Sequence, residues 1–300
     1  MSVIRVQGLS KFFGGLKAVD DLNFEVQKGQ VFGFLGQNGS GKSTTIRMLL
    51  SLIHPSSGSI EIFGKPVNKN RAELFEKIGA IIERPDLYPY LNAREHLNLF
   101  LKARKNKISK SAIDSTLEKV GLLNRQYDKV QTFSLGMKQR LGIAIALVHN
   151  PDLIILDEPT NGLDPNGIAD MRQLIRQLAN KEGKTVFVSS HLLSEIEQIS
   201  SQVLIIHKGQ RIAYGNTKEL LDPDTAILQI KTLDDEGALN VINRTNFKEY
   251  LLDNKTGIYI KMPISQISIL NEMLVFNKVS VIGIETKNTL EDYFLQVTSN

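Results

Sequence analysis

The segment GQNGSGKS, from Gly36 to Ser43, has the residue types and spacing of a phosphate-binding loop. Its glycines let the backbone turn N–H groups inward around phosphate oxygens, and a following helix adds the positive end of its dipole. Lys42 would reach the β and γ phosphates, and the Ser43 hydroxyl would ligate Mg²⁺. The segment follows a strand-like run and opens a helical one, so we favour a phosphate loop over a plain glycine-rich turn.

Two adjacent carboxylates end the apolar run LIILDEP. Alternate residues of a strand point to opposite faces, so Asp157 and Glu158 can do different jobs at one strand end. We expect Asp157 to hold Mg²⁺ and Glu158 to orient or deprotonate an attacking water. Alone, such a pair is more often a polar strand exit; together with the phosphate loop it indicates a nucleoside triphosphatase.

His191 and Ser134 add two further candidates. His191 ends the strand-like run TVFVSS and could hydrogen-bond a γ-phosphate or the water that attacks it, although a strand-end histidine is often structural. Ser134 is predicted to cap the helix in TFSLGMKQRLGIAIALV. That helix is either simply amphipathic or a second anion site, and two anion sites for one nucleotide could meet only across a dimer.

The elements that must position these residues alternate along the chain. Strand signals are DLNFEVQ, QVFGFL, SIEIF, IGAIIE, DLIILD, TVFVSS and QVLIIH. Several are too continuously apolar for a solvated sheet, which indicates buried parallel strands. From about residue 84 to residue 150 the pattern is helical, with a capping box at Asn92 and Glu95 and a further N-cap at Ser109. We therefore expect an α/β fold with a mixed sheet core and a helical subdomain.

A second domain is predicted after residue 222. Residues 223–300 read as a strand, a helix, two strands, a helix, a strand and a last helix, namely AILQIKT, DDEGALNVI, FKEYLLD, GIYIKMP, SQISILNEMLVF, VSVIGIET and TLEDYFLQV. The first six form the β-α-β-β-α-β order of a small ferredoxin-like α+β domain. A packing or dimerisation module and a regulatory module both fit this segment.

Composition excludes several other classes of protein. The chain has 300 residues, 42% of them hydrophobic and 23% charged, and no apolar run near the roughly 20 residues of a membrane-spanning helix. No cysteine is present, which rules out disulfides and thiolate metal sites and suits a reducing cytoplasm. The basic run KARKNKISK lacks aromatic residues for base stacking, so it favours a solvated helix end, or proximity to an anionic membrane, over nucleic-acid binding.

In order and spacing, these motifs resemble the nucleotide-binding subunit of an ABC transporter over about residues 2 to 220. GQNGSGKST corresponds to Walker A, FSLGMKQR to the signature, LIILDE to Walker B, NGLD to the D-loop and His191 to the H-loop histidine. The resemblance implies a P-loop ATPase fold and ATP and Mg²⁺ as cofactors. It also implies that nine Walker A residues contact the nucleotide: Gly36, Gln37, Asn38, Gly39, Ser40, Gly41, Lys42, Ser43 and Thr44.

In that family two ATP molecules lie between two such domains. The resemblance therefore implies that Ser134 and Gly136 act on the nucleotide of a partner copy and that Asp164 connects the two sites. It also implies that Phe13 in KFFGG stacks on adenine, with Phe12 as the alternative.

Glu83 departs from the family pattern. The strand IGAIIE ends where the family has a glutamine that contacts Mg²⁺ and the attacking water beside the surface on which the membrane subunit docks. A carboxylate is a good ligand for a hard cation, but it adds negative charge near Asp157 and Glu158. We expect a stronger dependence on Mg²⁺; the alternative is a surface glutamate at a strand end.

Glu83, SLGMKQR in place of LSGGQQR, and the C-terminal LEDYFL resemble a bacterial exporter subgroup that includes bacitracin-resistance and lantibiotic-immunity ATPases. Leu135 replaces a signature glycine and Met137 a glutamine, so we expect some contacts across the dimer to be lost. The resemblance implies an ATP-hydrolysing subunit that dimerises with itself or a paralogue. It would lie on the cytoplasmic face of a bacterial membrane, bound to a separate multi-span permease through a groove near Glu83, Tyr88 and Tyr90. It would export antimicrobial or amphipathic peptides or confer resistance to them.

Three alternatives remain. The cargo could be a lipid, a drug or an ion. A soluble ABC ATPase could act on ribosomes or DNA, although such proteins usually carry two cassettes or a long coiled-coil insert, and neither is present. A nucleotide sensor without turnover is disfavoured because Lys42, Asp157, Glu158 and His191 are all intact.

Overall fold

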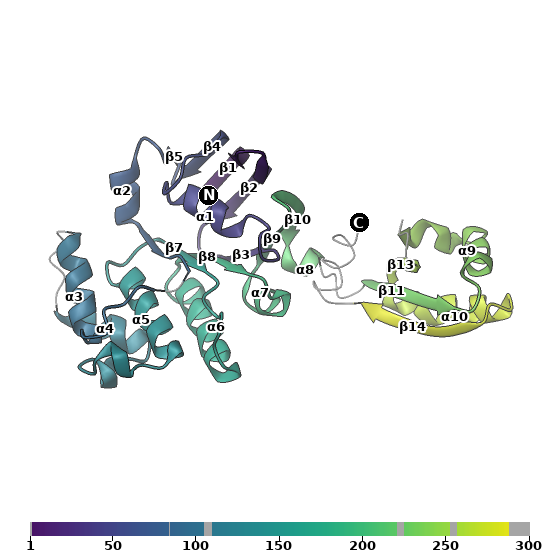
Figure 1. The fold of residues 1–300 in the computed structure, drawn as a ribbon. Helices are drawn as coiled ribbons and strands as arrows, with labels where there is room; N and C mark the ends of the chain where they lie inside the picture. Colours follow the sequence, from purple (N-terminus) through teal and green to yellow (C-terminus); the bar gives the residue numbers. More distant parts are fainter. Residues whose placement is uncertain (1, 84, 105–109, 221–224, 253–256, 288–300) are drawn as a thin grey trace. The chain divides into compact units, whose positions relative to one another are not determined.

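The computed structural model describes residues 2–83, 85–104, 110–220, 225–252 and 257–287. They form two compact units, Met1–Asn216 and Thr217–Asn300, which are shown in Figure 1 and described separately below. The boundary predicted between residues 222 and 223 lies in 221–224, outside the described residues.

A six-stranded sheet forms the centre of the first unit, with the strand order β10-β9-β3-β8-β7-β6. The strands are β3 Val31–Leu35, β6 Ile78–Ile81, β7 Leu153–Asp157, β8 Thr185–Ser190, β9 Gln202–His207 and β10 Gln210–Asn216. All neighbours pair in parallel except β10 with β9. Every residue of β3, β7 and β8 is buried, which explains their continuous apolar runs and confirms the predicted buried parallel strands.

A four-stranded antiparallel sheet, in the order β2-β1-β4-β5, forms the second layer. Its strands are β1 Ser2–Phe13, β2 Leu16–Gln27, β4 Ser57–Ile62 and β5 Lys65–Pro66. Phe24 of this sheet stacks on Phe32 of β3, which stacks in turn on Phe187 of β8, with centroid distances of 5.7 and 5.4 Å. These rings belong to one buried core that joins the two sheets. Because this core is closely packed, it holds the strand ends that carry the motifs in fixed positions.

Helices flank the six-stranded sheet (Figure 1). Helix α1, Lys42–Leu49, contacts β2 and β7, whereas α6, Pro165–Asn180, and α7, Leu193–Ile199, pack against β3 and β8. The short α2, Arg71–Glu76, precedes β6.

The region between β6 and β7 is helical, as predicted. It contains α3 Ala93–Ala103, α4 Lys110–Lys119, the 3₁₀ turns η1 Leu123–Arg125 and η2 Val130–Thr132, and α5 Leu135–Leu147. The capping box at Asn92 is confirmed, because its side chain accepts from the Glu95 N–H and the Glu95 side chain accepts from the Asn92 N–H. Ser134 caps α5 by accepting from the Met137 N–H, and the predicted cap at Ser109 lies outside the described residues.

The second unit contains an antiparallel sheet in the order β12-β13-β11-β14. Its elements are α8 Thr217–Leu220, β11 Thr225–Thr232, α9 Asp235–Asn243, η3 Asn246–Tyr250, β12 Leu251–Leu252, β13 Ile258–Pro263, η4 Ile264–Gln266, α10 Ile267–Phe276 and β14 Val281–Lys287. With strands numbered in chain order, the first and third lie at the centre, which is the ferredoxin-like arrangement. Its core is separate from that of the first unit.

One predicted strand of this unit, FKEYLLD, was mostly wrong. Its first residues form η3, and of its described residues only Leu251 and Leu252 are in a strand. Thr245 accepts from the Phe247 N–H and so caps a turn there, while the Phe247 and Tyr250 rings pack 6.4 Å apart. Local side-chain bonding therefore overrides the strand propensity of this aromatic segment. The predicted last helix, TLEDYFLQV, lies outside the described residues.

Candidate nucleotide-binding site

The phosphate-loop segment connects the end of β3 to the start of α1. Gly39 and Gly41 have φ angles of 79° and 105°, in the region that glycine alone adopts without strain. A Cβ on Gly41 would lie 2.4 Å from the carbonyl oxygen of Ala18, so the neighbouring strand also excludes a side chain. Gly41 is the N-cap of α1 and has no side chain to bond the first N–H groups of the helix. Those groups are the donors that an anion can use.

Lys42 is buried inside this loop. Its ammonium donates to the carbonyl oxygens of Gly36, at 2.7 Å, and Gln37, at 3.2 Å. It also lies 3.2 Å from Oε1 of Glu158. The loop therefore holds a positive charge at its centre, next to the second predicted carboxylate.

Asp157 lies at the end of β7 and is 2% exposed. Its Oδ1 accepts a hydrogen bond from the Ser189 hydroxyl at 2.5 Å, whereas its buried Oδ2 has no hydrogen bond to any described residue. Burial raises the pKa of the Asp157 carboxyl, and the hydroxyls of Ser189 and Ser43 act in the opposite direction. An unpaired buried carboxylate oxygen near a serine hydroxyl suits a hard divalent cation, so these residues fit Mg²⁺.

Glu158 has a left-handed backbone, with φ at 48°, which is strained for a residue with a side chain. Its carboxylate lies between three groups: Lys42, the Nδ1 of His191 at 3.3 Å, and the Asn161 amide, which donates at 3.2 Å. With this backbone conformation, the carboxylate of Glu158 lies beside both the predicted histidine and the phosphate-loop lysine.

One hollow of about 550 Å³ brings several predicted residues together. Its lining residues are Asn38, Ser43, Ile82, Glu83, Asp86, Gln139, Asp157, Glu158 and Asn161. The predicted metal ligands Ser43, Glu83 and Asp157 are thus on the wall of one space. Sequence reasoning missed Gln139, whose signal was a polar side chain on the otherwise apolar buried face of α5.

Glu83 pairs with a residue that sequence reasoning also missed. Its carboxylate lies 2.5 Å from the guanidinium of Arg47 on α1, and both side chains are about half exposed. The backbone of Glu83 is left-handed, with φ at 59°. The added negative charge therefore has a local counter-charge, and the role of Glu83 as a metal ligand stays a prediction.

The other predicted residues do not line this hollow. Phe12 and Phe13, at the end of β1, are 40% and 49% exposed, with the ammonium groups of Lys17 and Lys11 over their rings. Asp164 caps α6 by accepting from the Gly167 N–H at 2.7 Å. Ser134 and Gly136 lie at the N-terminus of α5. Their contacts with nucleotide stay predictions.

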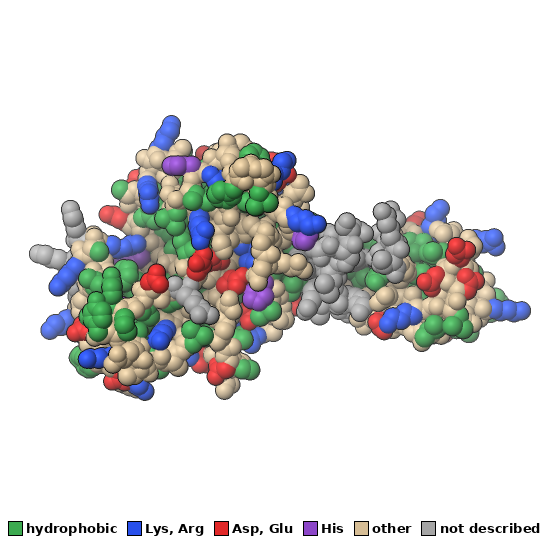
Figure 2. Space-filling view, in the orientation of Figure 1, with side chains coloured by type: hydrophobic (Ala, Val, Ile, Leu, Met, Phe, Trp, Pro, Cys, Tyr) green, Lys and Arg blue, Asp and Glu red, His purple; other side chains and the backbone are tan. Residues whose placement is uncertain are grey.

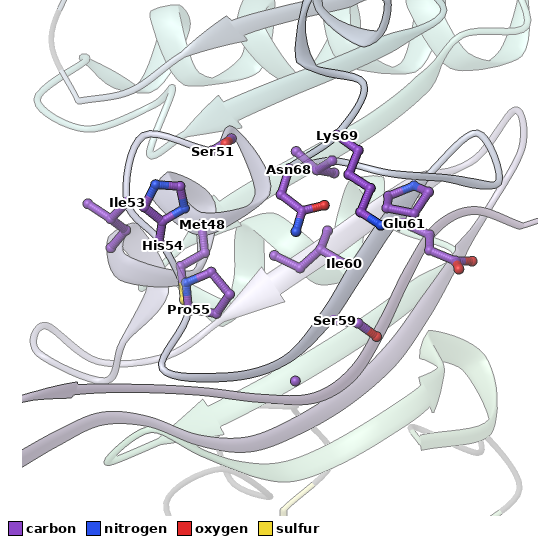
Figure 3. Close-up of a pocket in the computed structure, with 13 residues that line it drawn as sticks. Met48, Ser51, Ile53, His54, Pro55, Ser59, Ile60, Glu61, Asn68 and Lys69 are labelled. Atoms are coloured by element: carbon purple, nitrogen blue, oxygen red, sulfur yellow. The ribbon is translucent and has the colours of Figure 1, made fainter.

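A second hollow, of about 360 Å³, lies between the end of α1 and strands β4 and β5 (Figure 3). The close-up shows His54, Glu61 and Lys69 on its wall together with apolar side chains. None of the predicted site residues lines it, so we assign it no part in the chemistry.

Comparison with known proteins gives consistent matches. A family model described as "ABC transporter" matches residues 19–161. The chain is 44% identical to the bacitracin transport ATP-binding protein BcrA of Bacillus licheniformis over 299 residues, which is 99% of this chain and 97% of that protein. It is 43% identical to the lantibiotic transport ATP-binding protein SrtF of Streptococcus pyogenes over 210 residues, which is 70% of this chain and 89% of that protein.

Among solved structures, the chain is similar to the dimeric post-hydrolysis state of the ATP-binding cassette MJ0796 bound to ADP and Pi. The TM-score is 0.64 at 25% identity, over 71% of this chain and 98% of that one.

Proposed function

The chain belongs to the ABC transporter family of ATP-binding proteins, and from this premise we propose that it drives export of, or resistance to, peptide antibiotics through a separate membrane permease. The observation that carries the proposal is the 44% identity to a bacitracin transport ATP-binding protein along nearly the full length of both chains. The chain is also 38% identical over 230 residues to a linearmycin resistance ATP-binding protein of Bacillus subtilis, which supports a role in resistance.

Each residue of the site has a distinct part in the proposed ATP hydrolysis. The N–H groups of the phosphate loop and Lys42 bind the phosphates, and Ser43 and Asp157 hold Mg²⁺, with Glu83 as a further ligand. The ion, when bound, neutralises charge on the β and γ phosphate oxygens. Glu158 accepts the proton of the attacking water, and His191, 3.3 Å from its carboxylate, hydrogen-bonds the γ-phosphate.

We further propose that two copies of the chain, or this chain and a paralogue, close on two ATP molecules. In such a dimer Ser134 and Gly136 bind the nucleotide held by the partner. Within one chain the signature and the D-loop lie close together: a Cβ added to Gly162 would lie 3.1 Å from the Leu135 side chain, and one added to Gly136 would lie 3.7 Å from the Leu163 side chain.

The permease is proposed to dock beside Glu83. Exposed apolar side chains gather on this part of the unit, and Figure 2 shows hydrophobic side chains over the helical region. Tyr88 and Tyr90 contact each other with ring centroids 5.8 Å apart, and Leu99 and Phe100 project from α3. Within the described residues, no helix is both long and apolar enough to cross a bilayer. These exposed apolar groups are suited to packing against the cytoplasmic surface of a membrane-spanning partner.

The test is to tag the chain in its host, solubilise membranes in mild detergent and identify what co-purifies. A multi-span protein that raises the ATPase rate, and whose joint deletion with this chain sensitises cells to a peptide antibiotic, is the expected result. Recovery with ribosomes or DNA instead would overturn the transport assignment while leaving the ATPase assignment intact.

A further inference from the structure

Ser189, near the end of β8, contacts both carboxylate residues of the proposed site through one hydroxyl. The side chain is fully buried. Its Oγ donates to Oδ1 of Asp157 at 2.5 Å and accepts from the backbone N–H of Glu158 at 2.9 Å. No sequence motif assigns this serine a role, because both bonds depend on how two strands lie side by side.

The strand register explains the contact. β7 and β8 pair in parallel, and Asp157 lies opposite Ser189. Side chains opposite each other on neighbouring strands point to the same face of the sheet, so the short serine side chain meets the carboxylate. A hydroxyl is both donor and acceptor and can satisfy two neighbours at once. An apolar side chain of the same size would leave a buried carboxylate oxygen and a backbone N–H unpaired.

These two bonds have different consequences. The first occupies Oδ1 of Asp157, so the buried Oδ2, unpaired among the described residues, is the oxygen left for a cation. The second holds the N–H of Glu158, whose left-handed backbone needs support from its surroundings.

We propose that Ser189 is a positioning residue that presents one oxygen of Asp157 to Mg²⁺ and fixes the strained backbone of Glu158. The proposal rests on the proposed function, since it assumes that Asp157 is a metal ligand. Hydrogen-bond partners of metal ligands commonly alter metal affinity by about 10-fold to 100-fold.

The adjacent Ser190 provides a matched control. It is also buried on β8, but its hydroxyl accepts from the Leu192 N–H at 2.9 Å and lies 3.3 Å from the Leu192 carbonyl oxygen. Ser189→Ala and Ser190→Ala therefore remove the same atom from neighbouring buried positions, and only the first removes contacts with Asp157 and Glu158.

The experiment measures Mn²⁺ affinity by electron paramagnetic resonance on the full chain, with a non-hydrolysable ATP analogue bound. Ser189→Ala should weaken Mn²⁺ binding about tenfold and speed amide exchange in the peptide that contains Glu158, whereas Ser190→Ala should change neither. Ser189→Thr keeps the hydroxyl and should recover most of the affinity.

Equal Mn²⁺ affinity in the two alanine variants would overturn the positioning role. If Ser189→Ala does not fold, Ser189→Cys, with its weaker hydrogen bonds, must show the loss, and wild-type affinity in that variant would equally overturn it. A wild-type chain that binds neither analogue nor Mn²⁺ would instead refute the proposed function itself.

Discussion

The ammonium of Lys42 lies 3.2 Å from Oε1 of Glu158, so the phosphate-loop lysine and the proposed base share one ion pair. Lys42 is held in place by two loop carbonyls, and Glu158 by its contacts with His191 and Asn161. The phosphates of ATP would have to compete with Glu158 for the same ammonium. Nucleotide binding and the placement of the base are therefore linked through one contact.

The Arg47–Glu83 pair leads to a prediction about metal dependence. Glu83→Gln should still bind ATP and should lose less ATPase activity when Mg²⁺ is withheld, because one negative charge that the cation must neutralise near Asp157 is removed. Arg47→Gln should shift the Mg²⁺ titration by freeing Glu83 from its partner. Both variants should change unfolding free energy by less than about 1 kcal/mol, since the pair is exposed. Mg²⁺ titrations that overlay the wild type for both variants would refute the metal role of Glu83.

Phe13 and Phe12 can be separated by a binding measurement. If Phe13 stacks on adenine, Phe13→Ala should weaken ATP binding by about tenfold, in the range expected for loss of one stacked base. Phe12→Ala is the matched control, because the neighbouring ring is similarly exposed and also lies near a lysine. Titration of a fluorescent ATP analogue into the two variants decides between them. A larger loss for Phe12→Ala would reverse the assignment.

His149, just after α5, gives a prediction on pH and stability. Burial, with the nearby charge of Arg104, lowers the pKa of His149 to about 4. The folded chain therefore binds this proton less readily than the unfolded chain, so the stabilising contribution is complete above pH 6.5 and is lost as the pH falls towards 4. His149→Gln should flatten the decline in unfolding free energy over this range, measured by denaturant unfolding at several pH values. His54→Gln, at an exposed position, should leave the decline unchanged; the same decline in His149→Gln would contradict the prediction.

Much of the fold could be predicted because its signals are local. The phosphate loop depends on glycines within one short segment, the buried strands on continuous apolar runs, and the caps at Asn92 and Ser134 on residues three positions apart. The ABC ATPase fold that these signals indicated is confirmed by the family and structural matches.

What could not be predicted depends on side chains far apart in sequence. Arg47 meets Glu83, and Ser189 meets Asp157, only because separate elements pack side by side in a particular register. The strand β10 was missed because its sequence, QRIAYGN, carries few apolar residues in a row. In the second unit, the cap at Thr245 replaced a predicted strand by a 3₁₀ turn.

The most direct test of the account is the ATPase rate of Glu158→Gln, measured alongside its affinity for ATP and its mass in solution by light scattering. The variant keeps the shape of the side chain but cannot accept the proton of the attacking water. We predict that hydrolysis falls at least about 100-fold, that ATP affinity is retained, and that ATP converts the chain to a stable dimer. Hydrolysis at the wild-type rate would contradict the role of Glu158 as base and, with it, the mechanism built on this site.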